Sequence, residues 1–243
     1  MGNIHHESTP MSDLSDFMIT QKWPATRPDV IQLYSFPTPN GLKASIALEE
    51  MGLDYEAHRV PLGDEYVRSP EFLSLNPNNK IPAIIDPNGP DGKPIGIFES
   101  GAILLYLAEK SGKLMPSDLR GRTEVTQWIM FQMGGVGPMF GQLGFFYKFA
   151  GSDIEDPRPR ERYINEAKRL LNVLDGELAD RDWIAGEFSI ADIAIVPWLR
   201  ALEFYGADEV VGWRDFKNVV DYHDRFFERP GVQRGMNVPP REG

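Results

Sequence analysis

The sequence of 243 residues contains no cysteine. This absence excludes a disulfide scaffold, a thiolate metal site and a cysteine nucleophile. If the protein carries out sulfur chemistry, its substrate must supply the sulfur atom. The histidines show no HExxH or other metal-ligand spacing, so we expect no metal site; they are His5, His6, His58 and His223.

Basic residues are in the minority. The chain has 25 Lys and Arg against 36 Asp and Glu, which gives a formal net charge of -11. A surface of this charge repels phosphate groups, so we expect no nucleic-acid partner. An anionic small molecule would have to meet a local positive site.

Long apolar runs are missing as well. No stretch reaches the roughly 18 apolar residues of a membrane span, and the N-terminus MGNIHHESTPMSDLSD lacks the cationic start and apolar core of a signal peptide. We therefore expect a cytoplasmic protein with no membrane partner. Its 42% hydrophobic residues are typical of a folded chain, and its length suffices for two small domains.

A polar N-terminal segment precedes the first regular pattern. Residues 1–28 have no periodicity and are broken by Pro10, Pro24 and Pro28. We expect an extended arm or a disordered lead, which would need a partner surface to become ordered.

Residues 29–113 alternate between strand-like and helix-like segments. VIQLY, beginning at Val30, suits a strand, Leu42 to Met51 suits a helix, and DYEAHRVPL suits a second strand parallel to the first. A short helix in SPEFLSLNP, a hairpin from IPAIIDPNG and KPIGIF, and a helix from Glu99 to Gly112 follow. The order βαβαββα predicts an α/β domain with a thioredoxin-like arrangement.

The pattern changes near Ser117, where long helical periodicities replace the alternation of strands. Arg120 to Met133 and Arg160 to Leu178 are amphipathic, and SIADIAIVPWLRALEFYG is apolar on all sides, as expected of a buried central helix. Residues 117–238 are therefore predicted to form an all-α C-terminal domain.

Pro82 opens the strand in NKIPAIID, and a proline cannot donate to a sheet ladder. An edge strand or a cis turn would satisfy this constraint. In a thioredoxin-like arrangement the segment faces the turn FPTPNG, and a cis-proline there leaves the backbone groups of Ile81 free to pair with an extended, peptide-like ligand.

Glu99 and Ser100 stand where a strand ends and a helix begins. Ser100 could simply cap that helix. Alternatively, free N–H groups and a hydroxyl could bind a carboxylate while Glu99 accepts from an ammonium group, which together would fit the head group of a free amino acid.

Two further motifs favour structural roles. Ser189 and Asp192 in FSIADIAI form a capping box, whose loss typically costs about 1 kcal/mol and up to about 2 kcal/mol. The glycines of GGVGPMFGQ miss the G-x-G-x-x-G spacing and follow a helical segment, so we reject a dinucleotide site. Gly134 and Gly135 would instead loosen a helix or permit close packing, and Met139, Phe140 and Phe145 belong to the core or line an apolar pocket.

The segments TPNG, NPNNKIPAIID, FESGAILLYLAEK and FSIADIA, in this order, resemble cytosolic glutathione transferases, most closely the bacterial Nu class and its Ure2-like relatives. The resemblance spans residues 30 to about 235. It implies a thioredoxin-like domain followed by a helical domain, a homodimer, and glutathione as co-substrate.

The resemblance also implies functional residues. The catalytic pair near the glutathione sulfur corresponds to Thr38 and Asn40. Tyr34 and Ser35 are rivals, because other transferase classes use a tyrosine or a serine near the first strand, although Tyr34 is more consistent with packing under the sheet.

The remaining contacts with glutathione would come from several segments. The cysteinyl backbone would pair with Ile81 at Pro82, next to Lys80, and the γ-glutamyl end would bind Glu99 and Ser100. Arg169 would bring positive charge towards the thiolate. Relatives often have Gln or His where this chain has Val67, so the polar contact of that side chain with glutathione is expected to be missing or made through the backbone. The implied glutathione-binding residues are Val67, Lys80, Ile81, Pro82, Glu99, Ser100 and Arg169.

The implied activity is reduction of disulfide bonds with glutathione, alongside conjugation of small electrophiles. Two alternatives stay open from the sequence. One is glutathione-dependent cleavage of β-aryl ethers, and the other is a non-enzymatic binding or regulatory module of the same fold.

Overall fold

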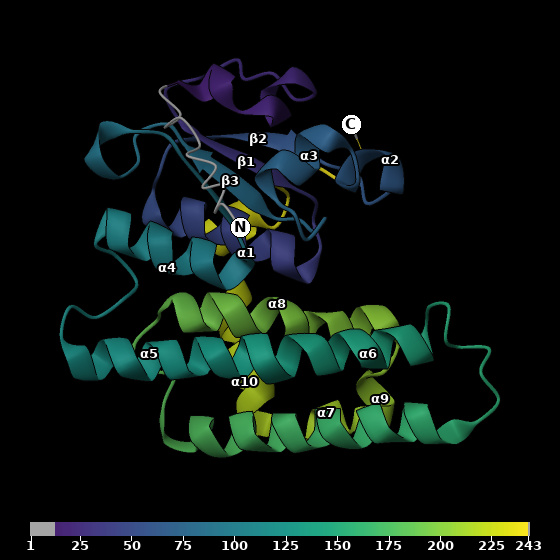
Figure 1. Cartoon of the computed structure of the whole chain (residues 1–243). Helices are drawn as coiled ribbons and strands as arrows, with labels where there is room; N and C mark the ends of the chain where they lie inside the picture. Colours follow the sequence, from purple (N-terminus) through teal and green to yellow (C-terminus); the bar gives the residue numbers. More distant parts are fainter. Residues whose placement is uncertain (1–12, 243) are drawn as a thin grey trace, which may run out of the picture.

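The computed structural model of the protein describes residues 13–242, and its elements form stacked layers (Figure 1). The N-terminal turns lie over one face of a sheet, and α1 (Pro39–Met51) and α4 (Ser100–Ser111) cover the other. Beyond these two helices lies the helical half of the chain.

The sheet has four strands in the order β2-β1-β3-β4. β1 (Ile31–Ser35) pairs parallel with β2 (Tyr55–Arg59) and antiparallel with β3 (Ala83–Asp86). β4 (Ile95–Phe98) completes the predicted hairpin with β3. All five residues of β1 are buried, as expected of a strand covered on both faces.

Short helices fill the connections of this half. α2 (Asp64–Val67) and α3 (Pro70–Leu75) lie between β2 and β3, where the sequence predicted one helix. The turn η3 (Pro90–Gly92) joins the strands of the hairpin. The order of the longer elements matches the prediction, and the thioredoxin-like α/β domain is confirmed.

The prediction for the N-terminal lead was wrong for residues 13–28, while residues 1–12 lie outside the described part of the chain. The turns η1 (Leu14–Asp16) and η2 (Met18–Gln21) pack on the domain itself. Leu14, Phe17 and Ile19 are buried in a cluster with residues of β1 and α3. These three apolar side chains cover the sheet face opposite α1, so no partner surface is needed.

The second half is all-helical, as predicted. Its central helix α8 (Ile190–Tyr205) is buried over most of its length. The other elements surround α8 and are α5 (Leu119–Phe131), the π-helical stretch η4 (Gln132–Val136), α6 (Gly137–Tyr147), α7 (Pro157–Glu177), η5 (Leu178–Asp180), α9 (Asp208–Val211), η6 (Trp213–Asp215), α10 (Lys217–Phe227) and α11 (Pro230–Gly235). Within residues 13–242, no helix combines the length and apolar character needed to cross a membrane.

Asp192 secures the start of α8 more extensively than a helix cap alone. The predicted capping box is present, with Asp192 Oδ2 accepting from Ser189 N at 2.7 Å. Asp192 Oδ1 also accepts from Ile184 N at 3.0 Å and from the Tyr222 hydroxyl at 2.8 Å. This fully buried carboxylate therefore connects α8 with α10 and with the preceding loop.

The two halves share one hydrophobic core. α1 packs against α8 and α11, and the cluster of buried residues continues from Leu33 of β1 through Ile46 of α1 to Ile195 of α8. The N-terminal end of α1 is consequently held between the sheet and the helical half.

Candidate functional site

The turn between β1 and α1 presents a free hydroxyl. Thr38 is the N-cap residue of α1, and its Oγ1 accepts from Gly41 N at 3.2 Å. The hydroxyl proton of Thr38 remains available to donate elsewhere. The turn needs glycine at position 41, because a Cβ there would stand 1.9 Å from the Phe36 carbonyl oxygen.

Asn40 is held by the helical half of the chain. The indole N–H of Trp198 on α8 donates to Asn40 Oδ1 at 2.9 Å. Since an indole N–H can only donate, it fixes which end of the amide faces Trp198. The Nδ2 group of Asn40, with two donors, therefore points away from Trp198 at the N-terminal end of α1, where the helix dipole also favours negative charge.

The glycines of GGVGPMFGQ make room for this indole. A Cβ on Gly137 would lie 3.4 Å from Trp198 Nε1 and 2.5 Å from Gln132 Nε2, and one on Gly141 would lie 3.5 Å from the indole ring. Gly134 and Gly135 fall within the π-helical stretch η4. The loosened helix predicted for Gly134 and Gly135 is present, whereas the close packing against Trp198 occurs at Gly137 and Gly141.

Ile81 and Pro82 lie at the start of β3, beside the strand that leads to the Thr38 turn. The Ile81–Pro82 peptide bond is cis. The ladder between β1 and β3 begins at the pair Tyr34 and Ala83, so the backbone of Ile81 lies just outside it. The neighbouring Lys80 is exposed, and its carbonyl oxygen accepts from the Asn76 amide.

Val67 ends α2 and is buried. Its side chain belongs to the cluster that contains Phe72 and Ile81. Any contact of Val67 with a ligand must therefore come from its backbone, which is one of the two outcomes expected from the sequence.

The interpretation of Ser100 as a helix cap was wrong, because Glu99 occupies the N-cap position of α4. The Glu99 side chain makes no capping hydrogen bond, and its backbone has a φ of 71°, a costly conformation for a residue with a Cβ. Glu99 is exposed and Ser100 is buried. The start of α4 thus combines an accessible carboxylate, a buried hydroxyl and N–H groups without a side-chain cap.

Lys43, which the sequence analysis did not single out, is fully buried beneath Ser100. Its Nζ donates to Gln132 Oε1 at 2.6 Å and to Ser100 Oγ at 3.3 Å. Burial lowers the pKa of Lys43 to about 7, while the negative charge of Glu99 acts in the opposite direction. The only signal in the sequence is a lysine within the otherwise apolar run LKASIAL.

Arg169 does not take the place expected from the resemblance. It lies on α7, is exposed, and its guanidinium binds Glu166 at 2.7 Å. In Figure 1, α7 is separated from α1 by the layer of α5, α6 and α8. The helical half brings Trp198, rather than Arg169, to the turn that carries Thr38 and Asn40.

The rival residues Tyr34 and Ser35 are both fully buried in β1. Tyr34 stacks on His58 with ring centroids 4.7 Å apart, and burial raises its pKa well above the usual range. Neither hydroxyl has a hydrogen-bond partner within residues 13–242. Tyr34 packs in the sheet as predicted, and both residues are less suited than Thr38 to contact a ligand.

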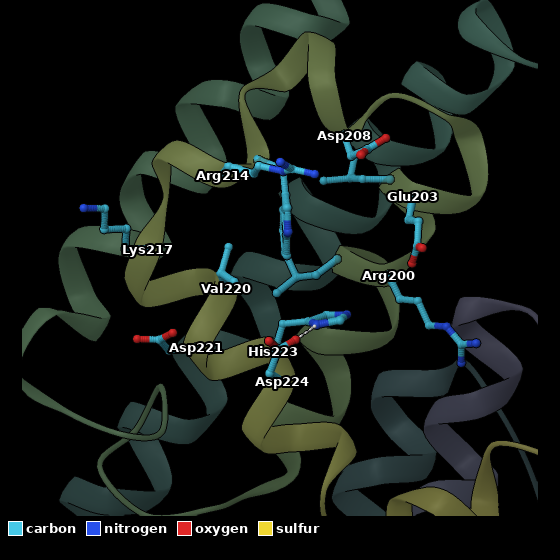
Figure 2. A pocket seen from close by; sticks show the side chains of 12 residues that line it. Arg200, Glu203, Asp208, Arg214, Lys217, Val220, Asp221, His223 and Asp224 are labelled. Atoms are coloured by element: carbon cyan, nitrogen blue, oxygen red, sulfur yellow. Dashed lines mark hydrogen bonds and ion pairs between the residues drawn. The ribbon is translucent and has the colours of Figure 1, made fainter.

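A cavity of 520 Å³ lies in the helical half, and Figure 2 shows the side chains that line it. Its lining carries both basic and acidic side chains, so no single sign of charge predominates. Its lining comes from α8, α9, α10 and the intervening turn and consists of Leu199, Arg200, Leu202, Glu203, Asp208, Trp213, Arg214, Lys217, Val220, Asp221, His223 and Asp224. In the described part of the chain, no group of three or more His, Cys, Asp or Glu residues could hold a metal ion.

Comparison with known protein families identifies the fold. The family model described as the glutathione S-transferase N-terminal domain matches residues 29–109, and that of the C-terminal domain matches residues 144–230. The chain belongs to the glutathione S-transferase family. The resemblance seen in the sequence is thereby confirmed at the level of the family, whereas assignment to the Nu class stays a prediction.

Relatives of this glutathione S-transferase include the disulfide-bond oxidoreductase YfcG of Escherichia coli, 44% identical over 209 residues that cover 85% of this chain and 94% of the relative. A glutathione transferase from Burkholderia graminis, solved with two glutathione molecules per subunit, is 60% identical, with a TM-score of 0.93 and coverage of 98% and 99% of the two chains. One from Pseudomonas putida, solved with a glutathione disulfide, is 59% identical, with a TM-score of 0.93 and coverage of 94% and 100%.

Proposed function

We propose that this protein binds glutathione across the N-terminal ends of α1 and α4 and uses its thiolate to reduce disulfide bonds. The protein is a glutathione-dependent enzyme of the transferase and disulfide-reductase type, as its relatives indicate. The observation that carries the finer proposal is the pair of donors on Thr38 and Asn40, oriented by Gly41 and Trp198.

Hydrogen bonds from these donors can supply the free energy needed to ionise the thiol of glutathione. A free thiol with a pKa near 8.5 is only a few per cent ionised at pH 7. Lowering this pKa by about two units needs roughly 2.7 kcal/mol. Hydrogen bonds to a charged group contribute roughly 1.5–3 kcal/mol each, so the Thr38 hydroxyl and the Asn40 amide suffice without a protein base.

The other groups of the site match the rest of the tripeptide. The cysteinyl backbone would pair with the backbone of Ile81 at the cis peptide bond. The γ-glutamyl group carries a carboxylate for Ser100 and the start of α4, and an ammonium group for Glu99. Lys80 and the backbone of Val67 border this path.

The proposed reaction balances with two glutathione molecules. The first thiolate attacks one sulfur of the disulfide, forms a mixed disulfide and releases the other sulfur as a thiol after protonation. The thiolate of a second glutathione then attacks the glutathione sulfur of the mixed disulfide, which yields glutathione disulfide and a second thiol. The two glutathione molecules in the Burkholderia graminis relative and the glutathione disulfide in the Pseudomonas putida relative support this sequence.

A coupled assay with glutathione, hydroxyethyl disulfide and glutathione reductase tests the proposal. We expect consumption of NADPH that depends on the protein and saturates with glutathione. Tight binding of glutathione with no turnover of this or other disulfides would contradict the proposal and favour the non-enzymatic binding module.

The expected homodimer stays a prediction, which exposed apolar side chains on α5 support. Leu119 is 81% exposed and Met130 is 54% exposed. Sedimentation analysis of the purified protein would distinguish a dimer from a monomer.

A Thr38→Ala variant should lower turnover about tenfold, the lower end of the range for one lost hydrogen bond to a thiolate. The pKa of the thiol of bound glutathione should rise in an ultraviolet titration. Loss of the helix cap should also reduce the free energy of unfolding by about 1 kcal/mol. Thr38→Ser keeps a hydroxyl and should remain close to the wild type, and an unchanged thiol pKa in Thr38→Ala would remove Thr38 from the chemistry.

A Trp198→Phe variant should lower turnover about three- to tenfold, because the Asn40 amide loses the donor that orients it. Adding Trp198→Phe to Asn40→Ala should cause little further loss, since Trp198 acts through Asn40. Trp213→Phe, an equal change near the cavity of Figure 2, serves as the matched control and should leave turnover unchanged. Fully additive losses in the double variant would contradict the role of Trp198.

A further inference from the structure

Lys43 is a buried amine that the proposed reaction does not use. It extends from α1, and its Nζ contacts Ser100 Oγ at the start of α4 and Gln132 Oε1 and Met133 Sδ from the helical half. The amine therefore lies where the two domains meet, directly under the proposed binding site for the γ-glutamyl group.

The surroundings of Lys43 contain no carboxylate partner. Within residues 13–242, no Asp or Glu oxygen lies within 4.0 Å of its Nζ. The charged group that acts on Lys43 is Glu99 from α4, at longer range, while Ser100, Gln132 and Met133 on the facing elements carry no charge. A protonated Lys43 is thus a buried cation without a contacting anion, which is unfavourable.

A ligand carboxylate at Ser100 would supply the missing charge. Lys43 donates to Ser100 Oγ, and the Ser100 hydroxyl in turn donates to Met133 Sδ at 3.9 Å. A thioether sulfur is a weak acceptor, so a ligand carboxylate would take its place as the acceptor of this proton. The same carboxylate would also meet the uncapped N–H groups of α4. Lys43, Ser100 and the carboxylate would then form a chain of charge-assisted hydrogen bonds.

We propose that Lys43 is the counter-charge for the α-carboxylate of the γ-glutamyl group and takes up a proton when that carboxylate binds. This inference rests on the glutathione site proposed above. It makes affinity depend on a group that does not touch the ligand: Lys43 acts through Ser100 and through its charge, and selects ligands that carry an α-carboxylate at this end.

The expected direction of the pH dependence follows from burial. In the free protein, burial lowers the pKa of Lys43 to about 7. A bound carboxylate favours the charged amine and raises this pKa. Binding should therefore consume protons above pH 7, and affinity should fall as the pH rises from about 7 towards the pKa of the complex.

Isothermal titration calorimetry with S-methylglutathione tests this inference, because that ligand has no thiol proton to release. Measurements at about pH 7.5 in buffers of different ionisation enthalpy should show uptake of at least about half a proton per bound ligand. The analogue with a γ-aminobutyryl group in place of the γ-glutamyl group lacks the α-carboxylate and should bind without proton uptake. This comparison needs no variant of the protein.

A Lys43→Met variant should bind S-methylglutathione at least about tenfold more weakly and without proton uptake. Lys113→Met, just beyond the other end of α4, is the matched control and should behave as the wild type. Binding by the wild type without proton uptake, or uptake retained in Lys43→Met, would overturn this inference alone. Failure of the wild type to bind S-methylglutathione would overturn the glutathione site itself and the inference with it.

Discussion

An Asn40→Ala variant is expected to reduce hydroxyethyl disulfide at least about tenfold more slowly than the wild type, with its fold intact. The substitution removes a donor to the thiolate, and one hydrogen bond to a charged group corresponds to roughly 1.5–3 kcal/mol, or about ten- to a hundredfold in rate. Asn40 lies at the surface end of α1 and is only partly buried, so the helix should form without it. Steady-state turnover and circular dichroism measure the two effects separately.

Two further variants sharpen this test. Asn40→Asp keeps an acceptor for the Trp198 indole but replaces the donors with a negative charge, so it should lose at least as much turnover as Asn40→Ala. Asn165→Ala, an exposed position on α7, should have no effect. If a folded Asn40→Ala protein turned over as fast as the wild type, Asn40 would have no part in the reaction.

An Asp192→Ala variant is expected to lose about 3–5 kcal/mol of unfolding free energy, the largest effect on stability that we predict. The carboxylate is fully buried and accepts from Ile184 N, Ser189 N and the Tyr222 hydroxyl. Alanine would leave these donors unpaired in the core. The sequence alone suggested about 1–2 kcal/mol, because a capping box accounts for only part of these contacts.

Denaturant unfolding of Asp192→Ala and of a matched variant measures this difference. Asp118 caps α5 by accepting from Gly121 N at 3.0 Å, but it is exposed. Asp118→Ala should therefore cost only about 1 kcal/mol. Equal losses of unfolding free energy in the two variants would show that Asp192 acts only as a helix cap and that its other buried hydrogen bonds add nothing.

The part of the fold that the sequence predicted is the part with local signals. The strand VIQLY, the stop at Gly52 and the run of α8 each carry their own periodicity or punctuation, and all three agree with the structure. The prediction for residues 13–28 was wrong because the short turns of this segment have no periodicity in the sequence. Its order depends on Leu14 and Ile19 reaching a sheet face formed by later residues.

In the site, too, only residues with a local sequence signal could be predicted. Thr38 and Asn40 could be proposed because they lie within one short motif at a strand-to-helix turn. Lys43 and Trp198 could not, because their partners Ser100 and Asn40 are 57 and 158 positions away in the sequence. Arg169 illustrates the converse, since a residue matched by motif can face solvent and bind its neighbour on the same helix.

Both contacts that the sequence missed join the two domains. Trp198 reaches Asn40 from α8, and Gln132 reaches Lys43 from the π-helical stretch after α5. The donors proposed for the sulfur, and the charge beneath the proposed γ-glutamyl site, are therefore positioned only when the helical domain is docked on the thioredoxin-like domain. The glycines of α6 that make room for the indole therefore support the proposed site indirectly, through the position of Trp198.

The pKa of the thiol of bound glutathione tests the central claim most directly. Ultraviolet absorbance of the thiolate, titrated in the complex of glutathione with the wild-type protein, should give a value at least about two units below the free value near 8.5. A bound thiol that titrates like free glutathione would contradict ionisation by the turn at the N-terminus of α1.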